Sequence, residues 1–108
     1  MNDKLRQLLN EYNWDEGFDL PKELLTNHDC DLALAMEIFY LADGYSYLID
    51  KSSGASLKEW KQFVEKLYFD ILEGKYIKTT CSFKNPLTKV QRYKLKMQGI
   101  PDIFFEDI

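Results

Sequence analysis

The feature that most constrains the fold is the run from Leu32 to Ala42, in which Glu37 is the only charged residue. A helix that is apolar on nearly all sides normally lies at the centre of a fold. Either Asp29 or Asp31 can cap the start of such a helix, and Asp43-Gly44 is a typical stop. The run therefore predicts a buried central helix.

Two shorter helices are predicted before this run. Residues 3–12 carry leucines and a tyrosine at helical spacing, which gives the segment one apolar face. The turn at 13–17 then breaks the pattern, and Gly17 permits a positive φ there. Pro21 suits the first turn of a second helix, which Asn27 can end.

Two more helices are predicted in the second half of the chain. Ser56 and Glu59 have the spacing of a capping box at the start of a long amphipathic helix, which Gly74 ends. A last helix is expected over residues 88–98. The sequence thus predicts an all-α fold of about five helices, in a single domain formed by residues 1–108.

Residues 76–83 are the exception to the helical pattern. Ile77 and Phe83 fall in one register of an alternation, and Lys78 and Ser82 fall in the other, which is typical of a strand. The chain offers no second strong strand to pair with it, and an isolated strand leaves backbone groups unpaired. We therefore expect extended chain or a minor two-stranded element.

Charge is distributed unevenly along the chain. The first 50 residues hold three basic and eleven acidic residues, whereas residues 51–100 hold eleven basic and four acidic ones. One interpretation is that the two halves attract each other within the domain; the other is that one face meets a charged partner. The net charge of −4 and the pI of about 4.9 argue against a nucleic-acid partner.

His28, Cys30 and Asp31 form the one obvious cluster of ligand-type residues. Zinc needs about four ligands, and one histidine without a close pair of cysteines does not supply them. A cysteine hydrolase would need a third orienting group and an oxyanion hole, and the sequence signals neither. We expect two free thiols, no metal, no cofactor and no catalytic residue, in a protein that is not an enzyme.

An aromatic residue in an acidic turn is the best candidate for a binding site. Trp14 lies beside Asp15 and Glu16, and Asp19 and Asp29 follow along the chain. Tryptophan is enriched among interface hot spots, and the acids suit lysine or arginine of a partner. The alternative is that Trp14 anchors the turn to the core. We predict these five residues as candidate partner contacts.

Three motifs carry a family resemblance: Asn13-Trp14-Asp15-Glu16-Gly17, the helix start Cys30-Asp31, and the apolar run that ends in Ala42-Asp43-Gly44. In these the sequence resembles the bacterial family catalogued as domain of unknown function 4274. The similarity is clear over the first half and looser beyond it. The resemblance implies a small bacterial helical domain, in which the polar motif residues cap helices and fix the turn. It implies no catalytic residue.

Small size, acidic charge and the lack of a catalytic motif favour a domain that binds another protein. The most concrete hypothesis is an immunity or antitoxin-type protein that neutralises a basic bacterial toxin such as a nuclease, because opposite charges speed association. The alternative is a general adaptor or subunit-interaction domain. A cytoplasmic location is expected, without a membrane partner, because the sequence has no secretory signal and no membrane-spanning apolar run.

Overall fold

The structure, a computed structural model, describes residues 3–50, 57–79 and 81–108. Its elements in chain order are α1 (Asp3–Glu11), η1 (Trp14–Glu16), α2 (Asp19–Thr26), α3 (Leu32–Leu41), α4 (Gly44–Ile49), α5 (Lys58–Leu72), α6 (Lys89–Met97) and η2 (Asp102–Phe104), where η marks a 3-10 helix. No strand occurs in these ranges. The prediction of an all-α fold is confirmed, with one α-helix more than expected.

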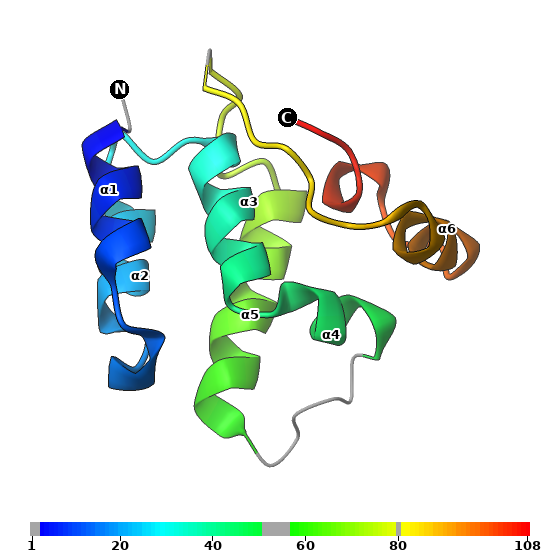
Figure 1. The fold of residues 1–108 in the computed structure, drawn as a ribbon, viewed down its shortest axis with the longest axis horizontal. Coiled ribbons are helices and arrows are strands. Elements are labelled where there is room, and N and C mark those ends of the chain that lie inside the picture. Colours follow the sequence, from blue (N-terminus) through cyan, green and yellow to red (C-terminus); the bar gives the residue numbers. More distant parts are fainter. Residues whose placement is uncertain (1–2, 51–56, 80) are drawn as a thin grey trace.

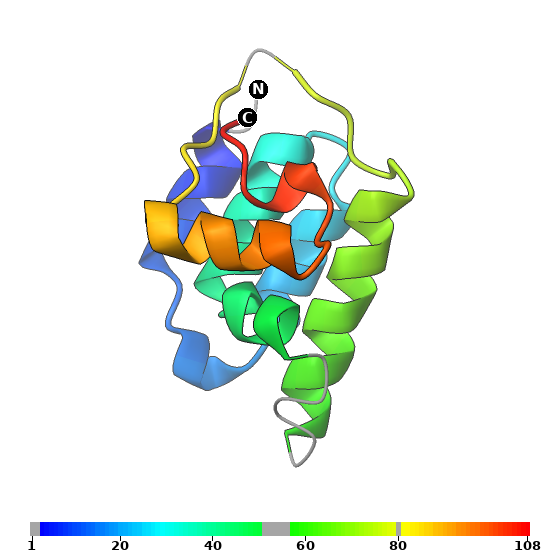
Figure 2. The ribbon, with the colours of Figure 1, turned by 90° about the vertical axis from the view of Figure 1, so that its right-hand side faces the viewer.

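Helix α3 lies at the centre, as its composition predicts (Figure 1). The pair α1 and α2 flanks it on one side, α5 packs along it, and α6 lies on the side away from α2, as Figure 2 also shows. Seven of the ten residues of α3 are buried, because other elements pack on most of the helix surface. Within the described ranges, no helix is long and apolar enough to cross a bilayer.

The reversal after α3 produces the helix that the sequence analysis missed. Helix α3 ends at Leu41 with Ala42 as its C-cap, just before the predicted stop at Asp43-Gly44. Asp43 then adopts a left-handed conformation with φ of 62°, and Gly44 begins α4. The Oγ of Ser46 donates a hydrogen bond to Asp43 Oδ2 at 2.8 Å. A helix of six residues is too short to show helical periodicity in the sequence, which is why α4 was not predicted.

Gly44 is required at this reversal because the backbone here passes close to the ring of Phe39 in the core. A β-carbon at this position would overlap the ring of Phe39, which is fully buried in α3. Gly44→Ala is therefore expected to lower the free energy of unfolding by about 1–3 kcal/mol, the usual cost of overpacking a core. Chemical denaturation measures the loss.

A second variant tests whether the overlap is the cause. In a Phe39→Leu background the smaller side chain leaves room for the new methyl group, so Gly44→Ala is expected to cost clearly less there. Equal costs in the two backgrounds would contradict the steric explanation.

The predicted capping box of α5 involves Ser56, which lies outside the described residues. Helix α5 begins at Lys58 with Leu57 in the N-cap position, and the Leu57 side chain makes no capping hydrogen bond. A complete capping box occurs at α6. There Thr88 Oγ1 accepts a hydrogen bond from the backbone N–H of Gln91, and the Gln91 side-chain oxygen accepts one from the backbone N–H of Thr88. Both helices end before a glycine with φ of 76°, Gly74 or Gly99.

Residues 76–79 and 81–83 run as extended chain, which is one of the two predicted alternatives. The carbonyl of Ile77 accepts a hydrogen bond from Leu32 N at 2.8 Å. Phe83 and Ile108 exchange two backbone hydrogen bonds of 2.9 and 2.8 Å, which ties the C-terminal segment to this stretch. Phe104 is fully buried, so the C-terminal segment packs against the core.

Candidate functional site

The turn that contains Trp14 is fixed by aromatic contacts and one hydrogen bond. The Trp14 ring lies edge-on between Tyr12 and Phe18, with ring centroids 5.9 and 6.3 Å away. The Tyr12 hydroxyl donates to the carbonyl of Gly17 at 2.8 Å, and Gly17 has the predicted positive φ, of 101°. Trp14 is partly buried against the core, in accord with the anchoring role.

The same tryptophan also borders a surface hollow of about 440 Å³. Its opposite wall is Trp60 of α5, whose Nε1 donates a hydrogen bond to the Ala42 carbonyl at 2.6 Å. Leu41 and Leu57 line the opening and remain 50% and 60% exposed, and Asp43 supplies a carboxylate. We call this feature the Trp14–Trp60 hollow. It leaves aromatic and aliphatic surface open to a partner beside an acidic turn.

The predicted acidic contacts do not all gather here. Glu16 and Asp19 are exposed and lie near the Tyr12 hydroxyl: partial burial first, and then these two charges, raise the pKa of Tyr12. The side chain of Asp15 lies outside the described part of the structure. Asp29 follows the far end of α2, an eight-residue helix about 12 Å long, and lies 3.4 Å from Nε2 of His28. The turn therefore unites Trp14, Glu16 and Asp19 and leaves Asp29 apart.

Five ion pairs bear on whether the acidic and basic halves attract each other. Arg6–Glu37 and His28–Asp29 lie within the first half, whereas Lys66–Asp70, Lys75–Asp70 and Arg92–Asp107 lie within the second. None of these five pairs joins the two halves. Glu16 and Asp19 thus have no ion pair among these contacts and are exposed.

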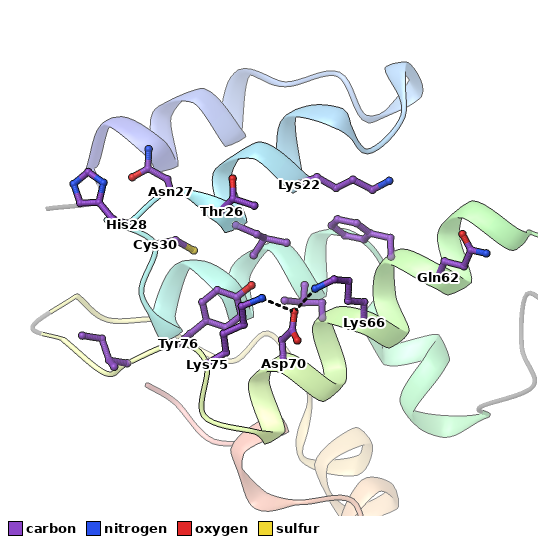
Figure 3. Close-up of a pocket in the computed structure, with 14 residues that line it drawn as sticks. Lys22, Thr26, Asn27, His28, Cys30, Gln62, Lys66, Asp70, Lys75 and Tyr76 are labelled. Atoms are coloured by element: carbon purple, nitrogen blue, oxygen red, sulfur yellow. Dashed lines mark hydrogen bonds and ion pairs between the residues drawn. The ribbon is translucent and has the colours of Figure 1, made fainter.

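A larger opening, which the sequence analysis did not predict, lies between α2 and α5 (Figure 3). Its volume is about 850 Å³. Leu25, Phe63 and Leu67 provide apolar lining, Lys22 lines the α2 side, and Lys66 and Asp70 line the α5 side. We call it the α2–α5 groove. Its lining comes from segments far apart in the chain, so no local spacing in the sequence could have indicated it.

The cluster of His28, Cys30 and Asp31 does not converge on one point. His28 and Cys30 both line the α2–α5 groove, but the His28 side chain is 93% exposed and Cys30 is partly buried. Asp31 is buried and caps α3, accepting from Leu34 N at 2.9 Å. Burial, and secondarily the charge of Asp31, raise the pKa of Cys30 to about 12, so its thiol stays protonated at neutral pH. Cys30 and Cys81 are both free.

Comparison with known proteins assigns a family without an activity. A family model described as a domain of unknown function (DUF4274) matches residues 2–72. The match includes the Trp14 turn, the Asp31 cap and the reversal at Gly44. Neither the curated proteins nor the solved structures contain a significant match to this chain. Because the family model covers more than half of the chain, the protein belongs to the DUF4274 family.

Proposed function

We propose that this domain acts by binding another protein, and most concretely that it is an immunity or antitoxin-type protein that neutralises a basic toxin. The Trp14–Trp60 hollow carries the proposal. Two tryptophans and two half-exposed leucines at one opening match the composition of binding hot spots, which bury aromatic anchors at the centre of an interface.

The negative charges around the hollow favour a positively charged partner. Glu16 and Asp19 are exposed beside it and Asp43 lines it. Carboxylates at the rim of an interface attract lysine and arginine of a partner and raise the association rate. A basic nuclease toxin fits this pattern, and the overall charge of −4 acts in the same direction.

Reversing two of these charges should slow binding. Glu16→Lys combined with Asp19→Lys is expected to lower the association rate constant and to weaken its dependence on salt, because rim charges act mainly on association. The melting temperature should stay nearly unchanged, since exposed substitutions usually change stability by about 0.5 kcal/mol or less. Surface plasmon resonance at several salt concentrations, against the purified product of the neighbouring gene, measures the effect.

A matched pair of substitutions controls for net charge. Glu73→Lys with Glu106→Lys makes the same change in total charge at exposed positions that do not line the hollow. Equal slowing by both pairs would show that net charge alone acts, and would refute the interface assignment. Lower stability with unchanged affinity would show that Glu16 and Asp19 act within the chain.

Coexpression separates the immunity function from a general adaptor function. An immunity protein should restore growth to cells that express the toxin gene directly upstream of it. If the neighbouring product binds but is harmless on its own, the domain is an adaptor rather than an immunity protein.

A further inference from the structure

The α2–α5 groove has the size and the apolar floor of a small-molecule site. Ligand pockets typically enclose about 300–1,000 Å³ and are mostly apolar with a few polar groups. This groove encloses about 850 Å³, and Phe63 and Leu67 on its floor are only 5% and 2% exposed. It shares no lining residue with the Trp14–Trp60 hollow, so its ligand is separate from the partner proposed above.

Cys30 and Tyr76 lie close together at one end of the groove, where burial and the neighbouring Cys30 raise the pKa of Tyr76. The hydrogen bond from Leu32 N to the Ile77 carbonyl holds the segment after Tyr76 against the start of α3. Lys22 and Gln62 lie toward the opposite end (Figure 3). The volume of about 850 Å³ lies in the range of small-molecule sites, which favours a small ligand over a helical peptide.

The polar groups of the groove have an excess of positive charge. Lys66 and Lys75 share one carboxylate, with their Nζ atoms 2.8 and 3.5 Å from Asp70 Oδ2. Lys22, on the opposite wall, has no ion pair among the described residues. In a chain with a net charge of −4, this local excess selects an anion.

We propose that the α2–α5 groove binds a single-chain amphiphile with a carboxylate head, that is, a fatty acid. The tail lies on Phe63 and Leu67 and points to the end formed by Cys30 and Tyr76. The carboxylate lies at Lys22, away from the Asp70 carboxylate, which two lysines already neutralise.

Titration calorimetry of the full chain with octanoate, decanoate and dodecanoate, each below its micelle concentration, tests the proposal. One-to-one binding is expected, with a Kd that falls about fourfold for each added methylene, as burial of the tail requires. Dodecyltrimethylammonium, which has the same tail and a cationic head, should not bind. Far-ultraviolet circular dichroism should show unchanged helix content at saturation.

Lys22 variants test the position of the head. Lys22→Glu is expected to weaken dodecanoate binding about fivefold or more, and Lys22→Arg to preserve it, because the contact is an exposed ion pair. Lys94→Glu on α6, on the other side of α3, is the matched control and should bind as the wild type does.

Several results would overturn the proposal. These are no saturable binding of any carboxylate, equal binding of the cationic amphiphile, loss of helix on ligand addition, or equal affinity in Lys22→Glu and wild type. Binding of an acidic helical peptide at this groove in place of the carboxylates would also overturn it. The binding of the neighbouring gene product is measured separately, so either proposal can fail alone.

Discussion

Replacing Phe104 by alanine is expected to lower the free energy of unfolding by about 3–5 kcal/mol, the range for removing a buried phenylalanine. The Phe104 side chain has no exposed surface, and its ring packs on those of Phe39 and Tyr68 with centroids 5.4 and 4.8 Å away. Alanine would leave a cavity between side chains that belong to two different helices and cannot readily close it. Urea unfolding followed by circular dichroism measures the change.

Phe69→Ala is the matched control for this prediction. Phe69 also contacts Tyr68, at a centroid distance of 5.2 Å, but 49% of its surface is exposed. Its removal should cost clearly less, because much of the ring is already in water. Similar losses in the two variants would contradict a central role of Phe104 in the core.

The position of Phe104 has a consequence for the family. The family match ends at residue 72, yet the aromatic cluster inside the matched segment is completed by Phe104. The carbonyl of Phe104 also accepts hydrogen bonds from the Tyr40 hydroxyl and from Asn85 Nδ2. The segment after residue 72 therefore supplies part of the core on which the matched helices pack.

The central helix and its ends were predictable because their signals are local. An apolar run with one charge can only be accommodated inside the fold, and Asp31 stands one residue before it. For α5, the predicted cap Ser56 lies outside the described residues, and the helix begins at Lys58. In α6, the apolar residues Val90, Tyr93 and Met97 are more than 60% exposed and only Leu95 is buried. Hydrophobicity alone does not say which apolar face meets the core.

A candidate site was predictable only where its residues stand close together in the sequence. Trp14 and its acidic neighbours stand together in the sequence, so the turn was recognised. The other wall of the hollow, Trp60, comes from a different helix, and its pairing with Trp14 depends on how α5 packs. The α2–α5 groove depends in the same way on tertiary packing, because Lys22 and Lys66 line it from two different helices.

Asp31→Ala is expected to lower the free energy of unfolding by about 2–4 kcal/mol, since it removes a helix cap and a hydrogen bond to a charged group. Asp31 is 3% exposed; Oδ1 accepts from Leu34 N at 2.9 Å and Oδ2 from the Thr79 hydroxyl at 2.6 Å. One carboxylate thus starts the central helix and attaches the extended segment to it. Asp31→Asn should retain most of the stability, because asparagine caps helices as well as aspartate does.

Asp29→Ala and Thr79→Val separate these two contributions. Asp29 was an equal candidate for the cap in the sequence, but it is exposed, so its replacement should change stability by about 0.5 kcal/mol or less. Thr79→Val removes this second hydrogen bond together with the one that Thr79 Oγ1 accepts from Cys81 N at 3.1 Å, so part of its effect should vanish in the Asp31→Ala background. Thermal unfolding of the four variants and the double mutant gives the coupling energy. If Asp29→Ala costs as much as Asp31→Ala, or if the Asp31 and Thr79 effects add fully, the carboxylate does not join the extended segment to α3.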